Sequence, residues 1–72
     1  MRQKTNEMRL SHIAANLRRG MQVTSNLQEW KDFWNSSYNV GGFLMWNGMS
    51  GEIAWKSVGG GCGFIYLKEK NE

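Results

Sequence analysis

Residues 42–57 read GFLMWNGMSGEIAWKS, and this stretch decides the fold class. Within it the apolar residues follow a period of two instead of the helical period, which indicates strands. Phe43–Trp46 is an apolar run, and the pair Asn47-Gly48 after it is strongly favoured in tight hairpin turns. Glu52–Ser57 then alternates between two faces. The stretch therefore predicts a β-hairpin.

The residues after this hairpin predict one more strand. Val58–Gly63 is rich in glycine and is expected to be a loop. Glycines can cradle a phosphate, but the known signatures place them between a strand and a helix, and here a strand follows. Phe64–Lys68 is predicted to be that third strand, and Glu69–Glu72 a charged tail.

The residues before the hairpin predict two helices. One apolar stripe at the helical spacing is formed by Leu10, Ile13, Ala14 and Leu17. Thr5 or Asn6 can cap this helix, and Gly20 is a natural C-terminal residue, so the helix is expected over 6–19. Met21–Thr24 is expected to be a short connector, with one extended segment as the alternative. After it, a capping box predicts a second helix over 26–36, with Asn26 and Glu29 or, one residue earlier, Ser25 and Gln28 as its members. Tyr38–Gly42 is expected to be loop.

Together these elements predict an α+β fold in which two N-terminal helices pack on a three-stranded antiparallel β-meander. Residues 1–72 form a single small domain, with 1–4 and 69–72 as frayed tails. Two short helices cover one face of such a sheet, yet the first and third strands are apolar on both faces. The second face is therefore predicted to contact a partner, or a second copy of the chain in a homodimer.

The charge distribution supports a contact surface. Between Asp32 and Lys68, 35 residues hold eight aromatic residues, eight glycines and only two charges. Depletion of charge with enrichment of aromatic residues and methionine is typical of the centre of protein interfaces. The residues predicted to bind a partner are Tyr38, Trp46, Met49, Trp55 and Tyr66.

A basic N-terminal end suggests a different partner. Residues 1–20 carry five cations and one acid, whereas residues 21–72 carry four cations and five acids. Arg9, Arg18 and Arg19 form a predicted basic patch that could contact nucleic acid or an acidic protein surface, although helix-terminus chemistry and solubility explain it equally well. Two helices followed by a hairpin also match the order of a winged-helix module, with Leu27–Trp34 as recognition helix and Asn47–Gly51 as wing. Stacking of bases on the aromatic sheet is a further alternative.

The sequence shows no catalytic constellation. Cys62 is the only cysteine and His12 the only histidine, and nothing in the sequence brings them together. The carboxylates are scattered, so neither a metal site nor a cofactor is expected. A lone thiol fits a reducing cytoplasm, no signal peptide is expected, and apolar runs of four residues are too short to span a membrane.

These observations predict a non-enzymatic, cytoplasmic binding protein that docks on a larger intracellular protein through an uncharged aromatic sheet face. Its size and composition are typical of accessory inhibitors carried by phages or mobile elements. The alternative is a small nucleic-acid-binding regulator, either winged-helix-like or sheet-stacking.

Overall fold

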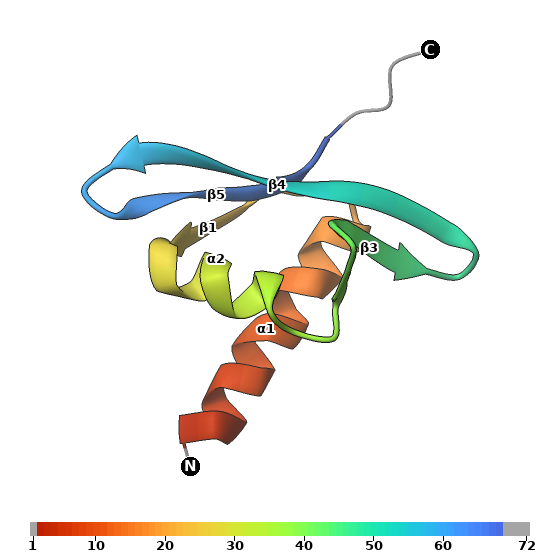
Figure 1. Cartoon of the computed structure of the whole chain (residues 1–72), viewed down its shortest axis with the longest axis horizontal. Helices are drawn as coiled ribbons and strands as arrows, with labels where there is room; N and C mark the ends of the chain where they lie inside the picture. The colour runs from red at the N-terminus through yellow and green to blue at the C-terminus, as the bar shows by residue number, and fades with distance from the viewer. Residues whose placement is uncertain (1, 69–72) are drawn as a thin grey trace.

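The computed structural model describes residues 2–68, with side chains from residue 6 onward. The elements are α1 (Arg2–Arg18), β1 (Val23–Asn26), α2 (Leu27–Trp34), β2 (Asn39–Val40), β3 (Phe43–Trp46), β4 (Met49–Gly59) and β5 (Cys62–Leu67). Both helices lie on the same side of one curled antiparallel sheet, and β4 runs along its whole length (Figure 1).

The sheet has five strands in the order β1-β5-β4-β3-β2. The expectation of a three-stranded meander is therefore wrong, although the helix pair and the antiparallel β3–β4–β5 succession belong to the observed fold. The two additional strands are the outermost ones at either side, and with them the sheet curls into half a barrel over the helices (Figure 1).

The two strands that the sequence did not reveal have too little local pattern to be recognised. β1 was expected to be a connector, yet Val23 pairs with Ile65 and Asn26 with Cys62 on β5. Only one of its four residues is apolar, and the polar Ser25 is buried. β2 was expected to be loop, and its two residues pair with β3. β1 is defined by a backbone partner far along the chain rather than by its own side chains, and β2, with two residues, is too short to show a period of two.

The glycine-rich segment is a tight turn between two strands and not the predicted loop. Gly59 pairs directly with Cys62, so only Gly60 and Gly61 connect β4 to β5. Their φ angles are 65° and 79°, as a two-residue hairpin turn requires. The Asn47-Gly48 turn between β3 and β4 is confirmed, with φ angles of 46° and 76°.

The C-terminal end of α1 and the N-terminal end of α2 follow the sequence signals, whereas the expected cap at Thr5 or Asn6 is wrong because α1 begins at Arg2. Gly20 has a φ of 80°, and its N–H donates to Leu17 while the Met21 N–H donates to Asn16, which is a Schellman motif. At α2 the Asn26 side chain accepts from the Glu29 N–H at 2.8 Å, and the Glu29 carboxylate accepts from the Asn26 N–H at 3.2 Å. The Asn26 capping box is therefore the one that forms. Residues 2–4, expected to be a tail, lie in α1, and 69–72 lie outside the described residues.

The core lies between the helices and the inner face of the sheet. The four residues of the predicted α1 stripe are all buried, together with five residues from β1, α2, β3, β4 and β5. The complete set is Leu10, Ile13, Ala14, Leu17, Val23, Phe33, Leu44, Ile53 and Ile65. Because both helices are used to cover this face, none of the described helices covers the other face (Figure 1).

Candidate functional site

The strand register divides the sheet into an inner and an outer face. Side chains alternate between the faces along a strand, and directly paired residues share a face. Leu44, Ile53 and Ile65 are buried against the helices and define the inner face. The outer face is formed by their neighbours in the strands, namely Thr24, Phe43, Met45, Ser50, Glu52, Ala54, Lys56, Phe64 and Tyr66.

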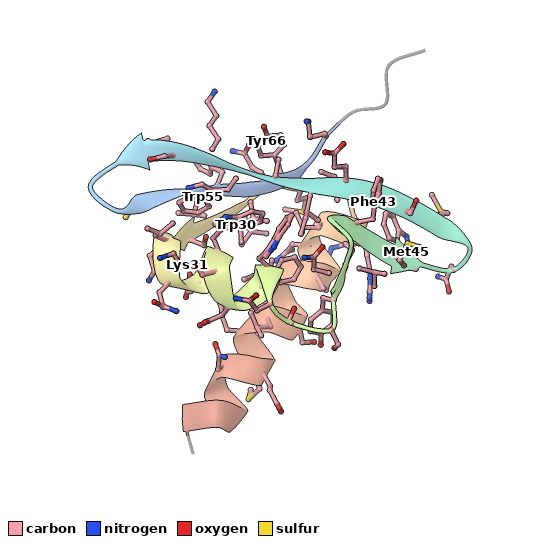
Figure 2. The ribbon with its side chains drawn as sticks, in the orientation of Figure 1. Trp30, Lys31, Phe43, Met45, Trp55 and Tyr66 are labelled. Carbon is pink, nitrogen blue, oxygen red and sulfur yellow. The ribbon has the colours of Figure 1, made fainter. Side chains whose placement is uncertain are left out.

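Large apolar side chains on the outer face remain accessible. Phe43 is 42% exposed and Met45 is 52% exposed, while Phe64 and Tyr66 are half-buried. Figure 2 shows Tyr66 pointing away from the helices, whereas Trp55 on the inner side points towards Trp30. The outer face therefore presents an apolar surface that the described residues leave uncovered.

Few charges interrupt this surface. The Lys68 ammonium lies 3.6 Å from the Glu52 carboxylate, so these two charges largely balance each other between Phe43 of β3 and Tyr66 of β5. Lys56 lies directly opposite Phe64 and is the outer-face cation without an ion-pair partner among residues 6–68. One cation beside four large apolar side chains suits a protein surface better than a chain of phosphates.

The five residues predicted to bind a partner do not form one surface. Tyr66 lies on the outer face, and Met49 is 58% exposed beside the β3–β4 turn, opposite Trp46. The remaining aromatic residues are used mainly for packing. Trp55 stacks on Trp30 with ring centroids 6.1 Å apart, Tyr38 stacks on Phe33 at 5.9 Å, and Trp46 packs against the core.

Phe43, Met45 and Phe64 are outer-face residues that the prediction omitted. A sequence signal existed, because β3 and β5 are apolar at consecutive positions and so apolar on both faces. That signal does not say which of the two faces the helices cover. The packing of α1 and α2 decides it.

The three arginines of the predicted basic patch also have different surroundings. The Arg9 guanidinium lies 3.3 Å from the Glu29 carboxylate and donates to the Thr24 carbonyl at 2.7 Å, so it joins α1 to α2 and β1. Arg19 donates to the Asn16 side chain at 2.8 Å, and Arg18 is exposed. α1, which carries Arg9 and Arg18, lies on the side of the sheet opposite to the outer face (Figure 1).

Several side chains that α2 would need as a recognition helix are already engaged within the protein. Phe33 is fully buried, Trp30 is held against Trp55, and Glu29 is committed to the cap and to Arg9. The predicted wing, Asn47–Gly51, is the β3–β4 turn with the start of β4, and it carries no cation.

The reactive side chains are not assembled into a catalytic site. The Asn16 side-chain N–H donates to the His12 ring Nε2 at 3.0 Å on α1, and Cys62 is exposed beside the β4–β5 turn. In the described part of the chain, no group of three potential metal ligands comes together. None of the helices in residues 2–68 has the length and apolarity needed to cross a membrane.

Comparisons with protein-family models, with curated proteins and with solved structures gave no match. The fold is that of a small α+β protein in which the described residues leave one face of the sheet open.

Proposed function

We propose that this protein is a non-enzymatic binding protein that docks on a larger protein through the outer face of its sheet. The observation that carries the proposal is the uncovered group of Phe43, Met45, Phe64 and Tyr66. Large apolar side chains that gather on one exposed face of a small domain mark an interaction that uses them. So small a domain acts by occupying a surface, which fits an inhibitor of the accessory type found in phages and mobile elements.

The chemistry of this face suits a protein partner. Aromatic side chains and methionine bury much area at low conformational cost and adapt to irregular surfaces. The Glu52–Lys68 pair lies between Phe43 of β3 and Tyr66 of β5, and Lys56 lies beside Phe64. Protein interfaces contain such polar groups among their apolar side chains, with about 10 direct hydrogen bonds in a typical case.

The experiment compares an outer-face variant with a matched control. The wild-type chain is immobilised, the protein it retains from a lysate of its source cell is purified, and binding of the purified pair is measured. Phe43→Ala together with Tyr66→Ala is expected to weaken binding by about tenfold or more, as loss of central aromatic contacts does. Met8→Ala, at an exposed methionine on α1, is the control and is expected to bind like wild type.

Nucleic acid is the competing outcome of the same experiment. Labelled single- and double-stranded oligonucleotides are titrated at about 50 and 200 mM salt, the range over which binding to phosphates weakens steeply. Binding that collapses with salt and requires Arg18 would contradict the proposal. Equal retention of the partner by wild type and by the outer-face variant would contradict it as well.

A further inference from the structure

The central strand β4 uses its two edges over different parts of its length. Residues 49–52 pair with β3 on one edge, and residues 53–59 pair with β5 on the opposite edge. β3 is preceded by Gly42, and there the chain turns away into β2. Beyond Ile53, the β3 side of β4 therefore has no partner strand within residues 2–68.

Two hydrogen bonds show which backbone groups face this open edge. The Lys68 N–H donates to the Glu52 carbonyl at 2.8 Å, towards β5, and the Ile53 N–H donates to the Gly42 carbonyl at 2.9 Å, towards β3. In an antiparallel ladder successive residues point their N–H and C=O groups to opposite sides. Trp55 and Ser57 thus direct their backbone groups to the open side, in line with Ile53.

An apolar pocket lies beside this edge. Its volume is about 380 Å³, and it is lined by Trp30, Lys31, Trp34 and Asn35 of α2. The Trp30 ring stacks on Trp55 of the open edge, and the Trp34 ring lies 3.6 Å from the Cβ position of Gly42, whose carbonyl accepts from Ile53. The two indoles contact each other with ring centroids 5.4 Å apart, so they form one apolar surface near the Ile53–Trp55 part of the open backbone segment, and Figure 2 shows Trp30 beneath Trp55.

The charges at this place favour an acidic occupant. Lys31 lines the pocket and no acidic residue does. Lys56 is the only charged residue of the segment 53–59. A second copy of the chain pairing edge to edge about this segment would bring two Lys56 side chains near each other, and like charges in cross-strand proximity are destabilising. The chain also has a net charge of +3, which opposes self-association.

We propose that the open edge of β4, with the Trp30–Trp34 pocket below it, binds an extended peptide segment of a partner protein. The peptide adds as a strand to Trp55 and Ser57, places an apolar side chain against the two indoles, which contact each other with centroids 5.4 Å apart, and directs a carboxylate two residues along, on the same strand face, to Lys31. Backbone hydrogen bonds provide affinity in this mode, and alternate side chains provide specificity. This site is separate from the outer face, and the proposal does not depend on the function proposed for that face.

The test uses a fluorescein-labelled octapeptide in which every second residue is threonine and the residues between are phenylalanine and glutamate in turn, so that phenylalanine and glutamate lie on the same strand face. Its binding is measured by fluorescence anisotropy, and hydrogen exchange of the ¹⁵N-labelled protein is followed by NMR. The amides of Trp55 and Ser57 are expected to exchange fast in the free protein and to become protected with peptide. The amides of Ala54 and Lys56, which already face β5, are expected to change little. The same peptide with alternate amides N-methylated cannot complete the strand and is expected to bind about tenfold more weakly.

Matched protein variants separate the edge, the pocket and the charge. Ser57→Pro removes the outward N–H at a position where β5 needs none, and Ser57→Ala is its control because it loses only the hydroxyl. Ser57→Pro and Trp34→Ala are each expected to weaken binding about tenfold, whereas Ser57→Ala binds like wild type. Lys31→Glu is expected to weaken binding of the glutamate peptide about fivefold and to strengthen binding of a peptide with lysine in place of glutamate.

Three results would overturn the proposal. The first is absence of binding at about 1 mM peptide, a concentration that detects even weak specific complexes. The second is equal affinity for the N-methylated peptide, or unchanged exchange at Trp55 and Ser57. The third is a dimer in analytical ultracentrifugation that Ser57→Pro dissociates, because the edge would then be occupied by a second copy. The variant with both Phe43→Ala and Tyr66→Ala is expected to bind the peptide as wild type does. A result against the peptide site can therefore be told apart from a result against the proposed function of the outer face.

Discussion

The inner and outer faces of this sheet are built from alternate residues of the same strands, and they have opposite roles. On the inner face, Leu44 and Ile65 are completely buried under the helices. On the outer face their direct neighbours Phe43 and Phe64 are equally apolar, yet both retain exposure. The comparison teaches that apolar character alone does not define a core residue in so small a domain. The number of elements available for covering a face decides it.

The largest expected difference between the faces is in stability. Phe33→Ala removes a fully buried ring that stacks on Tyr38 beneath the inner face, and it is expected to lower the free energy of unfolding by about 3–5 kcal/mol. Phe43→Ala on the outer face is expected to cost less than about 1 kcal/mol. Urea denaturation followed by circular dichroism measures both. Similar losses for the two variants would mean that the outer face is part of the core.

A smaller loss of stability is expected from Gly63→Ala in β5, and Gly51→Ala in β4 is its control. A Cβ at Gly63 would meet the Lys56 carbonyl and would lie 2.7 Å from the Trp55 ring, so Gly63→Ala must displace a stacked indole. We expect a loss of about 1–3 kcal/mol, the usual cost of overpacking. Gly51→Ala meets only the flexible end of Leu67 at 3.1 Å and is expected to cost less. Thermal denaturation of the two variants, with tryptophan fluorescence as the signal, tests this order.

The cap that positions α2 against the inner face is expected to contribute about 1 kcal/mol. Asn26→Ala removes the side-chain acceptor for the Glu29 N–H and is expected to destabilise the protein by that amount. Gln28→Ala, which removes only an exposed hydrogen bond to Asp32 one turn along, is the control with an expected loss of a few tenths of a kcal/mol. If both variants unfold at the same urea concentration, the capping box does not stabilise α2.

The smallest effect is expected at the ion pair on the outer face. Lys68→Ala removes the partner of Glu52, and because both side chains are about half exposed the loss should be about 0.5 kcal/mol or less. Lys56→Ala removes an outer-face cation without an ion-pair partner among the described side chains and serves as the control. The difference between the two variants should disappear at about 1 M salt, where charges are strongly screened. A difference that persists would indicate that Lys68 acts through packing of its alkyl chain.

Several local features could be predicted from the sequence because their causes are local. The Asn47-Gly48 turn, the α1 stripe, the Gly20 helix end and the Asn26–Glu29 box each depend on residues within a few positions of one another. The structure confirms all four. The proposed sites were harder to predict. Of the residues predicted for binding, Tyr66 lies on the outer face, whereas Trp55 and Tyr38 are engaged in stacking with residues from α2.

The sequence by itself determined the two helices, the Asn47-Gly48 hairpin turn and the presence of more apolar sheet surface than two short helices can cover. Only the tertiary structure decided that Val23–Asn26 is a strand, that the glycine-rich segment is a two-residue turn, and which face of the sheet stays open. The physical reason is the range of the interactions. Caps, turns and helical stripes depend on near neighbours, whereas strand pairing and the covering of a face depend on residues far apart in the chain.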